Sequence, residues 1–201
     1  MHPEVASHAM ANGGDMPASE LIAGASFGGI PLRPKRGYTF ANFRTNHQVA
    51  RARCVVMRYT SGARPYGLHT LAIVGSSGTG KTHLLNAAGH AAIVNGQFGS
   101  AVTLSSSRLY QLVEDGLRFD DWWVWRHRLV QAEWLAIDDI DQVGQSPIVA
   151  SVVLDVLRER SIGLGRTLLS LSQQSIVQSS STFRDFLLDV SAISLTQDKT
   201  K

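Results

Sequence analysis

Eight consecutive residues, Gly75–Thr82, have the types and the spacing that a phosphate-binding loop needs. They read G-x-x-x-x-G-K-T, and three of them are glycine. A phosphate chain needs backbone N–H donors at close range, so its loop favours residues without bulky side chains. In such a loop Lys81 would reach the β- and γ-phosphates as a solvent-facing point charge, and the Thr82 hydroxyl would bind Mg²⁺. The expected phosphate-binding residues are Gly75, Ser76, Ser77, Gly78, Thr79, Gly80, Lys81 and Thr82.

Two adjacent carboxylates, Asp138 and Asp139, end an apolar run 57 residues after Lys81. Ligands of open α/β sheets bind at the carboxyl ends of the strands, which is where this pair would lie. In the arrangement called Walker B, Asp138 would hold Mg²⁺ through water and Asp139 would orient the attacking water. The other interpretation is that the two acids belong to a turn or a helix cap.

Short apolar runs alternate with helical patterns along the chain and would position these residues. Strands are expected at 71–74, 101–104, 134–139, 166–171 and 192–195. Helices are expected at 46–60, 108–115, 120–131, 147–160 and 183–188, and one from the loop to Gly96. This alternation predicts an α/β fold, a three-layer sandwich whose five-stranded parallel sheet is covered on both faces. A glycine-rich loop between strand and helix then places the fold among the P-loop NTPases.

Composition sets the broad class and the domain limits. The chain has 201 residues and one cysteine, contains no run of membrane-spanning length, and shows no secretory signal, which suits a reducing cytoplasm. Residues 1–30 are rich in Ala, Gly and Ser and are expected to form a disordered tail. Residues 31–64 would form an aromatic and basic linker with a helix, and residues 65–201 the nucleotide-binding core.

Basic residues are concentrated before the phosphate loop. Residues 31–64 contain eight Lys and Arg and no acidic residue, so the remainder of a chain of net charge +3 carries −5. Such asymmetry indicates either a face that binds a polyanion or a solvated basic helix.

Three stretches together resemble a known family. They are Y-T-F-A-N-F at Tyr38–Phe43, G-T-G-K-T-H-L-L-N-A-A-G-H at Gly78–His90, and L-A-I-D-D-I at Leu135–Ile140. They are similar to the ATPase core of the bacterial replication initiator DnaA and to its shorter Hda-type regulators, over roughly residues 37–195. The resemblance implies an AAA+ fold with ATP or ADP and Mg²⁺ as ligands, and residues 38–46 on the adenine side. The further cofactor-binding residues expected on this basis are Tyr38, Phe43, Asn46 and His83, the last packed behind the loop.

The sequence departs from the family pattern at three places. The polar sensor that follows Walker B in the family is matched by Ser172, which is our second candidate catalytic residue, with Gln173 beside it. Residues 185–198, where the family places an arginine finger, contain no Arg or Lys. The helical lid and the DNA-binding domain of the family are not matched by this sequence. We therefore expect ATPase activity to be weak or to depend on a partner.

A tryptophan-rich stretch lies where the initiators insert a helical wedge that contacts DNA. Basic residues flank its tryptophans, a combination that suits single-stranded nucleic acid. The other interpretation is a buried stripe, because Trp122 and Trp125 are three residues apart on a helix. The basic residues are Arg118, Arg126, His127 and Arg128.

Three functions remain open from sequence alone. The leading one is an ATP- or ADP-binding AAA+ protein of the DnaA/Hda type that acts in or regulates replication initiation through an AAA+ initiator or another replication protein. The second is an ATPase that loads a helicase or helps a transposase. The third is a nucleotide-gated binding module with negligible hydrolysis. Single-stranded DNA is a candidate partner, and oligomers are compatible with all three.

Overall fold

The computed structural model describes residues 26–27, 30–31, 33–61, 69–96, 98–172, 174 and 181–195. The chain divides into two compact units, Met1–Pro31 and Leu32–Lys201. In the first unit, β1 (Ser26–Phe27) pairs with β2 (Ile30–Pro31) in an antiparallel ladder. The other residues of the predicted disordered tail lie outside the described residues, and the three proposed domain limits stay predictions.

The second unit is built on one sheet of five strands, whose order is β4-β5-β6-β3-β7. All four pairs of neighbours are parallel, which confirms the predicted five-stranded parallel sheet. Every predicted strand is present, with each end within one residue of its expected position. The strands are β3 (Thr70–Gly75), β4 (Ala101–Ser105), β5 (Trp134–Asp138), β6 (Arg166–Leu171) and β7 (Ser191–Leu195).

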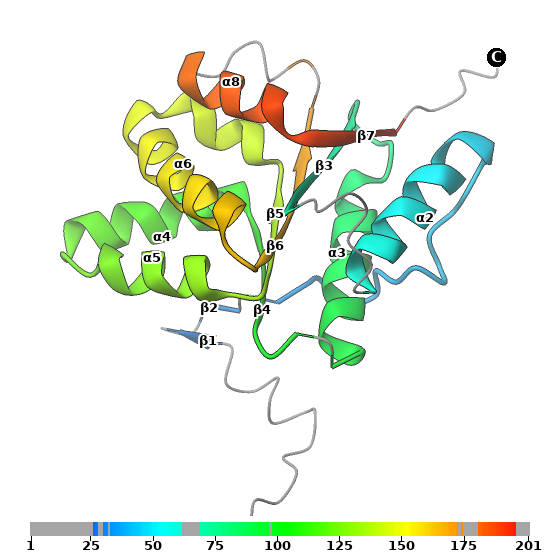
Figure 1. Ribbon diagram of the computed structural model, residues 1–201, viewed down its shortest axis with the longest axis horizontal. Coiled ribbons are helices and arrows are strands. Elements are labelled where there is room, and N and C mark those ends of the chain that lie inside the picture. Colours follow the sequence, from blue (N-terminus) through cyan, green and yellow to red (C-terminus); the bar gives the residue numbers. More distant parts are fainter. Residues whose placement is uncertain are drawn as a thin grey trace, which may run out of the picture. The chain divides into compact units, whose positions relative to one another are not determined.

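The helices cover both faces of this sheet, as Figure 1 shows. On one side α3 packs against the central strands and α2 packs on α3 and β7. On the other side α4, α5 and α6 contact one another, and α8 packs on α6. The three-layer α/β sandwich is therefore confirmed. The helices are α2 (His47–Thr60), α3 (Lys81–Val94), α4 (Ser106–Arg118), α5 (Trp122–Gln131), α6 (Pro147–Ile162) and α8 (Ser181–Asp189).

The two layers of helices explain why the strand pattern was easy to recognise. Every residue of β5 and β6 is buried, because helices exclude water from both faces of the inner strands. Their sequences are accordingly near-continuous apolar runs. The edge strand β7 is only partly covered and alternates in exposure.

Helix ends follow local chemistry and correct the sequence prediction in places. Asn46 caps α2, its Oδ1 accepting from the N–H of Val49 at 2.9 Å. Helix α5 starts at Trp122 and not at the predicted Asp120, because Asp120 has φ 56, in the left-handed region that a helix excludes. A 3₁₀ helix, η2 (Ile140–Gln145), follows β5 and was not predicted. Helix α3 ends at Val94, with Asn95 as its cap and the predicted Gly96 one residue beyond.

A buried arginine joins α6 to the end of α5 and the start of β6. Arg160 is 2% exposed and its Nη1 donates to the carbonyl oxygens of Leu129, Val130 and Ala132 at 2.6–2.9 Å. Its Nε and Nη2 donate to Thr167 Oγ1 and the Arg166 carbonyl oxygen. Burial lowers the pKa of Arg160 to about 10, so the side chain still carries its charge at neutral pH.

No helix among the residues that the structure describes is long and apolar enough to cross a membrane.

Candidate nucleotide-binding site

The predicted phosphate loop connects the end of β3 to the start of α3, and its glycines have steric reasons to be glycine. Gly78 and Gly80 have φ values of 79° and 95°, a region that side chains disfavour. A Cβ at Gly75 would lie 2.6 Å from the carbonyl oxygen of Leu195 and 2.8 Å from Thr79 Oγ1. A Cβ at Gly80 would also lie 3.0 Å from the Phe43 ring. The loop therefore packs closely against β7 and against the segment that precedes α2.

The first turn of α3 leaves its backbone donors available. Gly80 is the N-cap and has no side chain to accept from the N–H groups that follow. These groups and the positive end of the helix dipole form an anion-binding geometry. Thr82 lies in this first turn and is partly exposed, whereas Ser76, Ser77 and Gly78 on the loop are exposed.

Lys81 is placed differently from our expectation. Its side chain is buried, with only 7% exposed, and its Nζ donates to the carbonyl oxygen of Ser76 at 3.0 Å. Thr79 Oγ1 donates to the same oxygen at 2.8 Å. The prediction of a solvent-facing charge is wrong, because the ammonium group folds back into the concave loop to satisfy its hydrogen bonds.

The two Walker B carboxylates differ in their surroundings. Asp138 is the last residue of β5 and is 5% exposed. Asp139 is half-buried and has a left-handed backbone, with φ 54. Burial raises the pKa of the Asp139 carboxyl, the Asp138 charge raises it further, and the Lys81 ammonium opposes both. The loop lysine and the acids therefore lie within electrostatic range of one another.

Two polar residues beside the acids were not predicted from the sequence, Ser170 of β6 and Asp141 of η2. Strand β6 lies between β5 and β3. The hydroxyl of Ser170 donates to Asp138 Oδ1 at 2.5 Å and accepts from the backbone N–H of Asp139 at 2.9 Å. Asp141, on η2, is buried, and its Oδ1 accepts from the backbone N–H of Ser172 at 3.2 Å. A serine within the apolar run of β6 was the only signal in the sequence. Gln173 lies outside the described residues.

The aromatic segment before α2 is attached to α3 through His83. The His83 ring contacts Tyr38 and Phe43 edge-on, with ring centroids 4.8 Å and 5.1 Å apart. Its Nε2 lies 3.1 Å from the Thr39 carbonyl oxygen and 3.0 Å from Asn42 Oδ1. Because Asn42 Oδ1 also accepts from Thr39, both neighbours are acceptors and Nε2 carries the proton. This packing brings Tyr38, Phe43 and His83 together beside the loop, whereas the Asn46 side chain caps α2.

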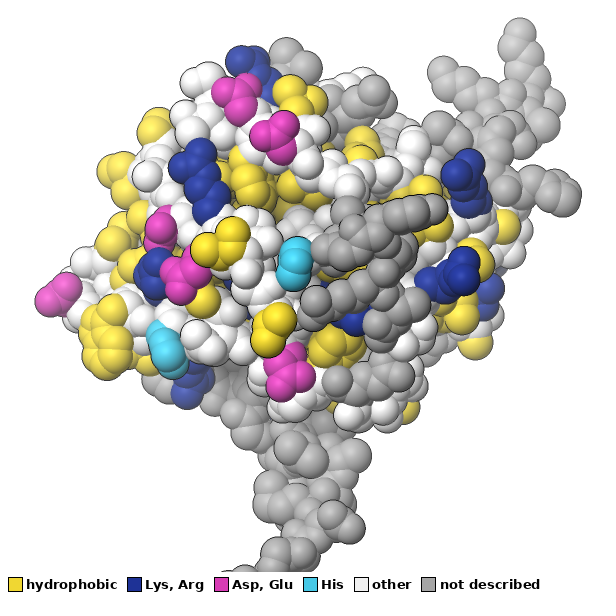
Figure 2. Space-filling view, viewed as in Figure 1, with side chains coloured by type: hydrophobic (Ala, Val, Ile, Leu, Met, Phe, Trp, Pro, Cys, Tyr) yellow, Lys and Arg dark blue, Asp and Glu magenta, His cyan; other side chains and the backbone are white. Residues whose placement is uncertain are grey.

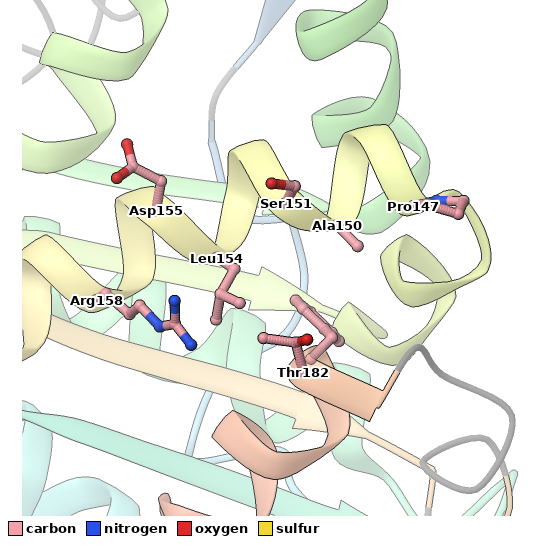
Figure 3. Close-up of a pocket in the computed structure, with 8 residues that line it drawn as sticks. Pro147, Ala150, Ser151, Leu154, Asp155, Arg158 and Thr182 are labelled. Atoms are coloured by element: carbon pink, nitrogen blue, oxygen red, sulfur yellow. The ribbon is translucent and has the colours of Figure 1, made fainter.

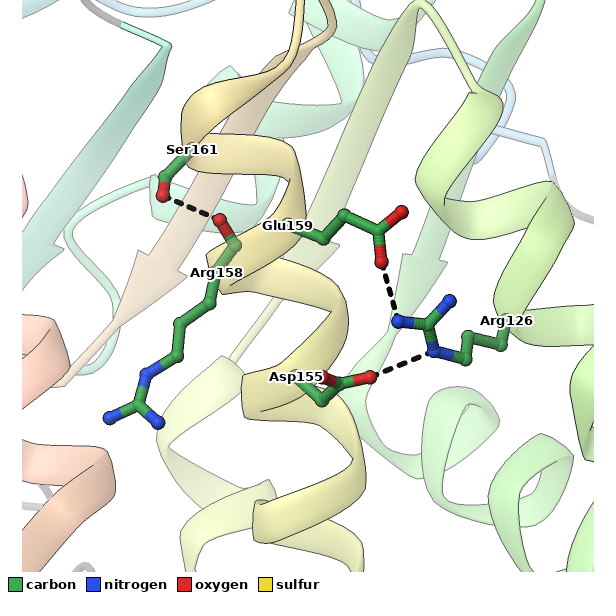
Figure 4. A network of polar contacts seen from close by, with 5 residues as sticks. All are labelled: Arg126, Asp155, Arg158, Glu159 and Ser161. Atoms are coloured by element: carbon green, nitrogen blue, oxygen red, sulfur yellow. Dashed lines mark hydrogen bonds and ion pairs between the residues drawn. The ribbon is translucent and has the colours of Figure 1, made fainter.

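The tryptophan-rich helix α5 is buried in part, and its contact with DNA stays a prediction. Trp125 is buried, but Trp123 is 70% exposed. Figure 4 shows Arg126 of α5 bound to two acids of α6, through Nε to Asp155 at 2.8 Å and through Nη2 to Glu159 at 2.5 Å. Arg126 therefore serves to hold α5 against α6 in this structure.

A separate cavity of about 420 Å³ lies between α6 and α8 (Figure 3). None of the expected site residues lines it. Its lining residues are Pro147, Ala150, Ser151, Leu154, Asp155, Arg158, Thr182 and Phe183.

The two helical layers differ in the charged side chains on their surfaces. Figure 2 shows Lys and Arg side chains over α2 without Asp or Glu beside them, whereas both signs occur together over α4–α6. In the part of the chain that the structure describes, no salt bridge involves the basic residues of the segment before α3. The described cations of this basic surface are Arg33, Lys35, Arg36, Arg44, Arg51, Arg53 and Arg58.

Comparison with solved structures gives the same fold. A replication initiator DnaA bound to AMPPCP and single-stranded DNA matches with a TM-score of 0.73 and 20% identity, over 82% of this chain and 51% of that one. Domain III of DnaA from Thermotoga maritima matches with a TM-score of 0.70 and 18% identity, over 81% and 68%. The DnaC helicase loader matches with a TM-score of 0.66 and 14% identity, over 80% and 98%. The chain thus spans about half the length of the initiator structure.

Sequence comparison identifies the family. No curated protein sequence matches the chain. The family model of the bacterial DnaA ATPase domain matches residues 34–159, which include the aromatic segment, the phosphate loop and the Walker B acids. Because this match covers more than half of the 201 residues, the chain belongs to the bacterial DnaA ATPase domain family.

Proposed function

We propose that this protein binds ATP or ADP with Mg²⁺ and acts, through protein partners, in the initiation of DNA replication or its regulation. The observation that carries the proposal is one juxtaposition. The glycine-rich loop, with the Lys81 side chain folded into it, lies at the same edge of the sheet as the buried carboxylate of Asp138. The family match and the AMPPCP in the similar initiator structure support it.

The residues present suit the triphosphate and the metal. The uncapped N–H groups of α3 and the ammonium of Lys81 are donors for phosphate oxygens, once Nζ exchanges the Ser76 carbonyl for them. Mg²⁺ takes oxygen ligands and usually keeps several waters, so Thr82 and the Asp138 carboxylate would hold it together with phosphate oxygens. Tyr38, Phe43 and Asn46 would line the adenine side, with His83 supporting them.

The chain's own residues would then prepare the γ-phosphate for attack by water. The bound metal would neutralise charge that develops on the phosphate oxygens. Asp139 would orient the water, and Ser172, at the end of the strand between the loop and the acids, would contact the γ-phosphate.

Replacing the loop lysine tests nucleotide binding. We expect Lys81→Ala to abolish measurable binding of fluorescent ATP and ADP, because phosphate loses its only charged donor in the loop. Lys81 is buried, so circular dichroism and thermal melting must show that the variant is folded. Arg158→Ala, which removes an exposed cation on α6, is the matched control and should bind as wild type does. Equal affinity in wild type and Lys81→Ala would disprove the assignment.

A helicase-loading role is the second candidate. A solved structure of the DnaC helicase loader shares this fold with a TM-score of 0.66, over 80% of this chain. Native mass spectrometry of the protein with a replicative helicase or with a DnaA-type initiator would distinguish the two roles. A complex with the helicase alone would favour loading, and a complex with the initiator alone would favour regulation.

Single-stranded DNA is proposed as a further partner. The basic surface provides cations, most of them exposed, that have no salt-bridge partner among the described residues and can contact the phosphates of the strand. The exposed Trp123 is on α5, in the helical layer on the other side of the sheet, and is not part of this surface. Arg126 is not part of this proposal, because two carboxylates already bind it.

A further inference from the structure

One buried hydroxyl contacts both Walker B acids. Ser170 lies within β6 and is fully buried, and both of its neighbours in sequence are leucines. Its Oγ is 2.5 Å from Asp138 Oδ1 and 2.9 Å from the backbone nitrogen of Asp139. The two acids belong to β5 and to the turn after it, so Ser170 connects them to the neighbouring strand.

The direction of each hydrogen bond is determined by the partners. A backbone N–H can only donate, so the Ser170 oxygen must accept from Asp139. A carboxylate can only accept, so the single hydroxyl hydrogen must point to Asp138. The hydroxyl therefore donates to the Asp138 carboxylate and accepts from the Asp139 backbone.

We propose that Ser170 is a positioning residue of the magnesium site. Its donation to Oδ1 restrains the Asp138 carboxylate, which would hold Mg²⁺ through water. Its acceptance from the Asp139 N–H holds the left-handed turn at φ 54 and thereby the position of the Asp139 side chain. This inference rests on the proposed nucleotide function and assigns the Mg²⁺ dependence of that function to a residue outside the known motifs.

The test compares nucleotide affinity with and without magnesium. Ser170→Ala removes the hydroxyl, and Ser170→Cys replaces it with a slightly larger thiol that is only a weak donor. We expect the gain in affinity for fluorescent ADP that Mg²⁺ provides to fall by about 10-fold in both, as for other residues that orient metal ligands. Affinity in EDTA should not change.

Thr167→Val is the matched control. Thr167 is also fully buried on β6, but its hydroxyl accepts from Arg160 and lies at the other end of the strand from the acids. This variant should lose stability and keep the full effect of Mg²⁺. Ser170→Cys keeps the test decisive if Ser170→Ala does not fold.

The failures of the two proposals differ. A wild-type protein that binds no nucleotide, or binds it without regard to Mg²⁺, would overturn the proposed function and this inference with it. A normal Mg²⁺ effect in wild type that persists undiminished in both Ser170 variants would overturn this inference alone. The same holds if the Ser170 variants lose affinity equally in Mg²⁺ and in EDTA, since that outcome indicates a purely structural role.

Discussion

Asp139 combines an unusual backbone with an unusual charge environment. Its φ of 54 and ψ of 44 are in the left-handed region, which asparagine and aspartate tolerate better than other side chains do. Asparagine is therefore the substitution that changes the charge at this position while keeping the turn. Alanine would add backbone strain and confuse the interpretation.

Asparagine substitutions separate the roles of the two acids. Asp139→Asn should keep Mg·ATP bound and stop hydrolysis, because the water-orienting carboxylate is neutralised while the metal ligand remains. Asp138→Asn should instead weaken the Mg²⁺ dependence of binding. Nucleotide titration and phosphate release on the same preparations measure both effects. Wild-type hydrolysis in both variants would show that the roles are wrongly assigned.

The raised pKa of Asp139 predicts a pH-dependent difference in stability. The ordinary value is 3.8, and burial followed by the Asp138 charge moves it upward in the folded protein. Between the two values the native state binds more protons than the unfolded state, so the contribution of Asp139 to stability falls as pH rises. Asp139→Asn does not titrate, and its advantage in unfolding free energy should grow with pH through this window and then level off.

Urea unfolding of wild type and Asp139→Asn in EDTA, over a series of pH values, measures this difference. A difference that is independent of pH would contradict it.

At the scale of elements, α6 is attached to the rest of the fold on two sides. Asp155 and Glu159 bind Arg126 of α5 at the surface, and such exposed ion pairs contribute little. Arg160 faces inward and donates to four backbone carbonyls. Gly165 belongs to the same arrangement, because a Cβ there would lie 2.9 Å from Arg160 Nη2. We infer that the inward contact dominates.

Arg160→Met should destabilise the protein by about 2–4 kcal/mol, because carbonyls near the starts of β5 and β6 lose their buried donor. The Arg158→Met variant is the control, since Arg158 is exposed on the same helix, and it should stay within about 0.5 kcal/mol of wild type. Chemical denaturation measures both. Equal stabilities of the two variants would mean that water satisfies these backbone carbonyls in place of the guanidinium, at no cost in the free energy of unfolding.

At the scale of the whole molecule, the proposed nucleotide site and the proposed nucleic-acid contact involve different elements. The candidate site residues Lys81 and Asp138 lie at the carboxyl edge of the sheet, whereas Figure 2 shows Lys and Arg side chains over α2. Arg51 and Arg58 are exposed on α2, and their separation of seven residues places them on one face, two turns apart.

Binding of single-stranded DNA should depend on this face and on salt. Replacing Arg51 and Arg58 together by serine should weaken binding of an oligonucleotide and reduce the slope of log affinity against log salt concentration by about 1.4, or about 0.7 for each lost phosphate contact. Fluorescence anisotropy at several salt concentrations measures the slope. The Arg158→Ser variant should keep the wild-type slope, and an unchanged slope in the double variant would exclude α2 from the contact.

Hydrolysis should require a partner. An arginine from a neighbouring subunit contributes roughly 10³–10⁵ to turnover in other nucleotide hydrolases, and residues 185–198 contain none. We expect the protein to bind ATP, release phosphate very slowly, and accelerate when a DnaA-type initiator that carries such an arginine is added. Steady-state phosphate release with and without the initiator measures this.

Fast release by the protein alone would indicate that Arg184, on α8, or another residue acts as the finger. No stimulation by any AAA+ partner would favour the nucleotide-gated binding module.

The sequence alone determined the features whose causes are local. All five strands were predictable to within one residue. The inner strands were recognisable because burial on both faces demands apolar runs, and turns or helices end them. The phosphate loop was predictable because its glycines, Lys81 and Thr82 act within eight consecutive residues. The membership of the family follows from these same local motifs.

The tertiary structure alone decided the contacts between distant segments. Ser170 meets Asp138 across 32 residues because β6 lies between β5 and β3, and no local pattern specifies that strand order. His83 meets Asn42 because α3 packs beside the aromatic segment, and Arg160 is buried because the end of α5 and the start of β6 meet at α6. Lys81 bends back to Ser76 for a related reason: the fold of the loop creates an acceptor that the residue order does not show.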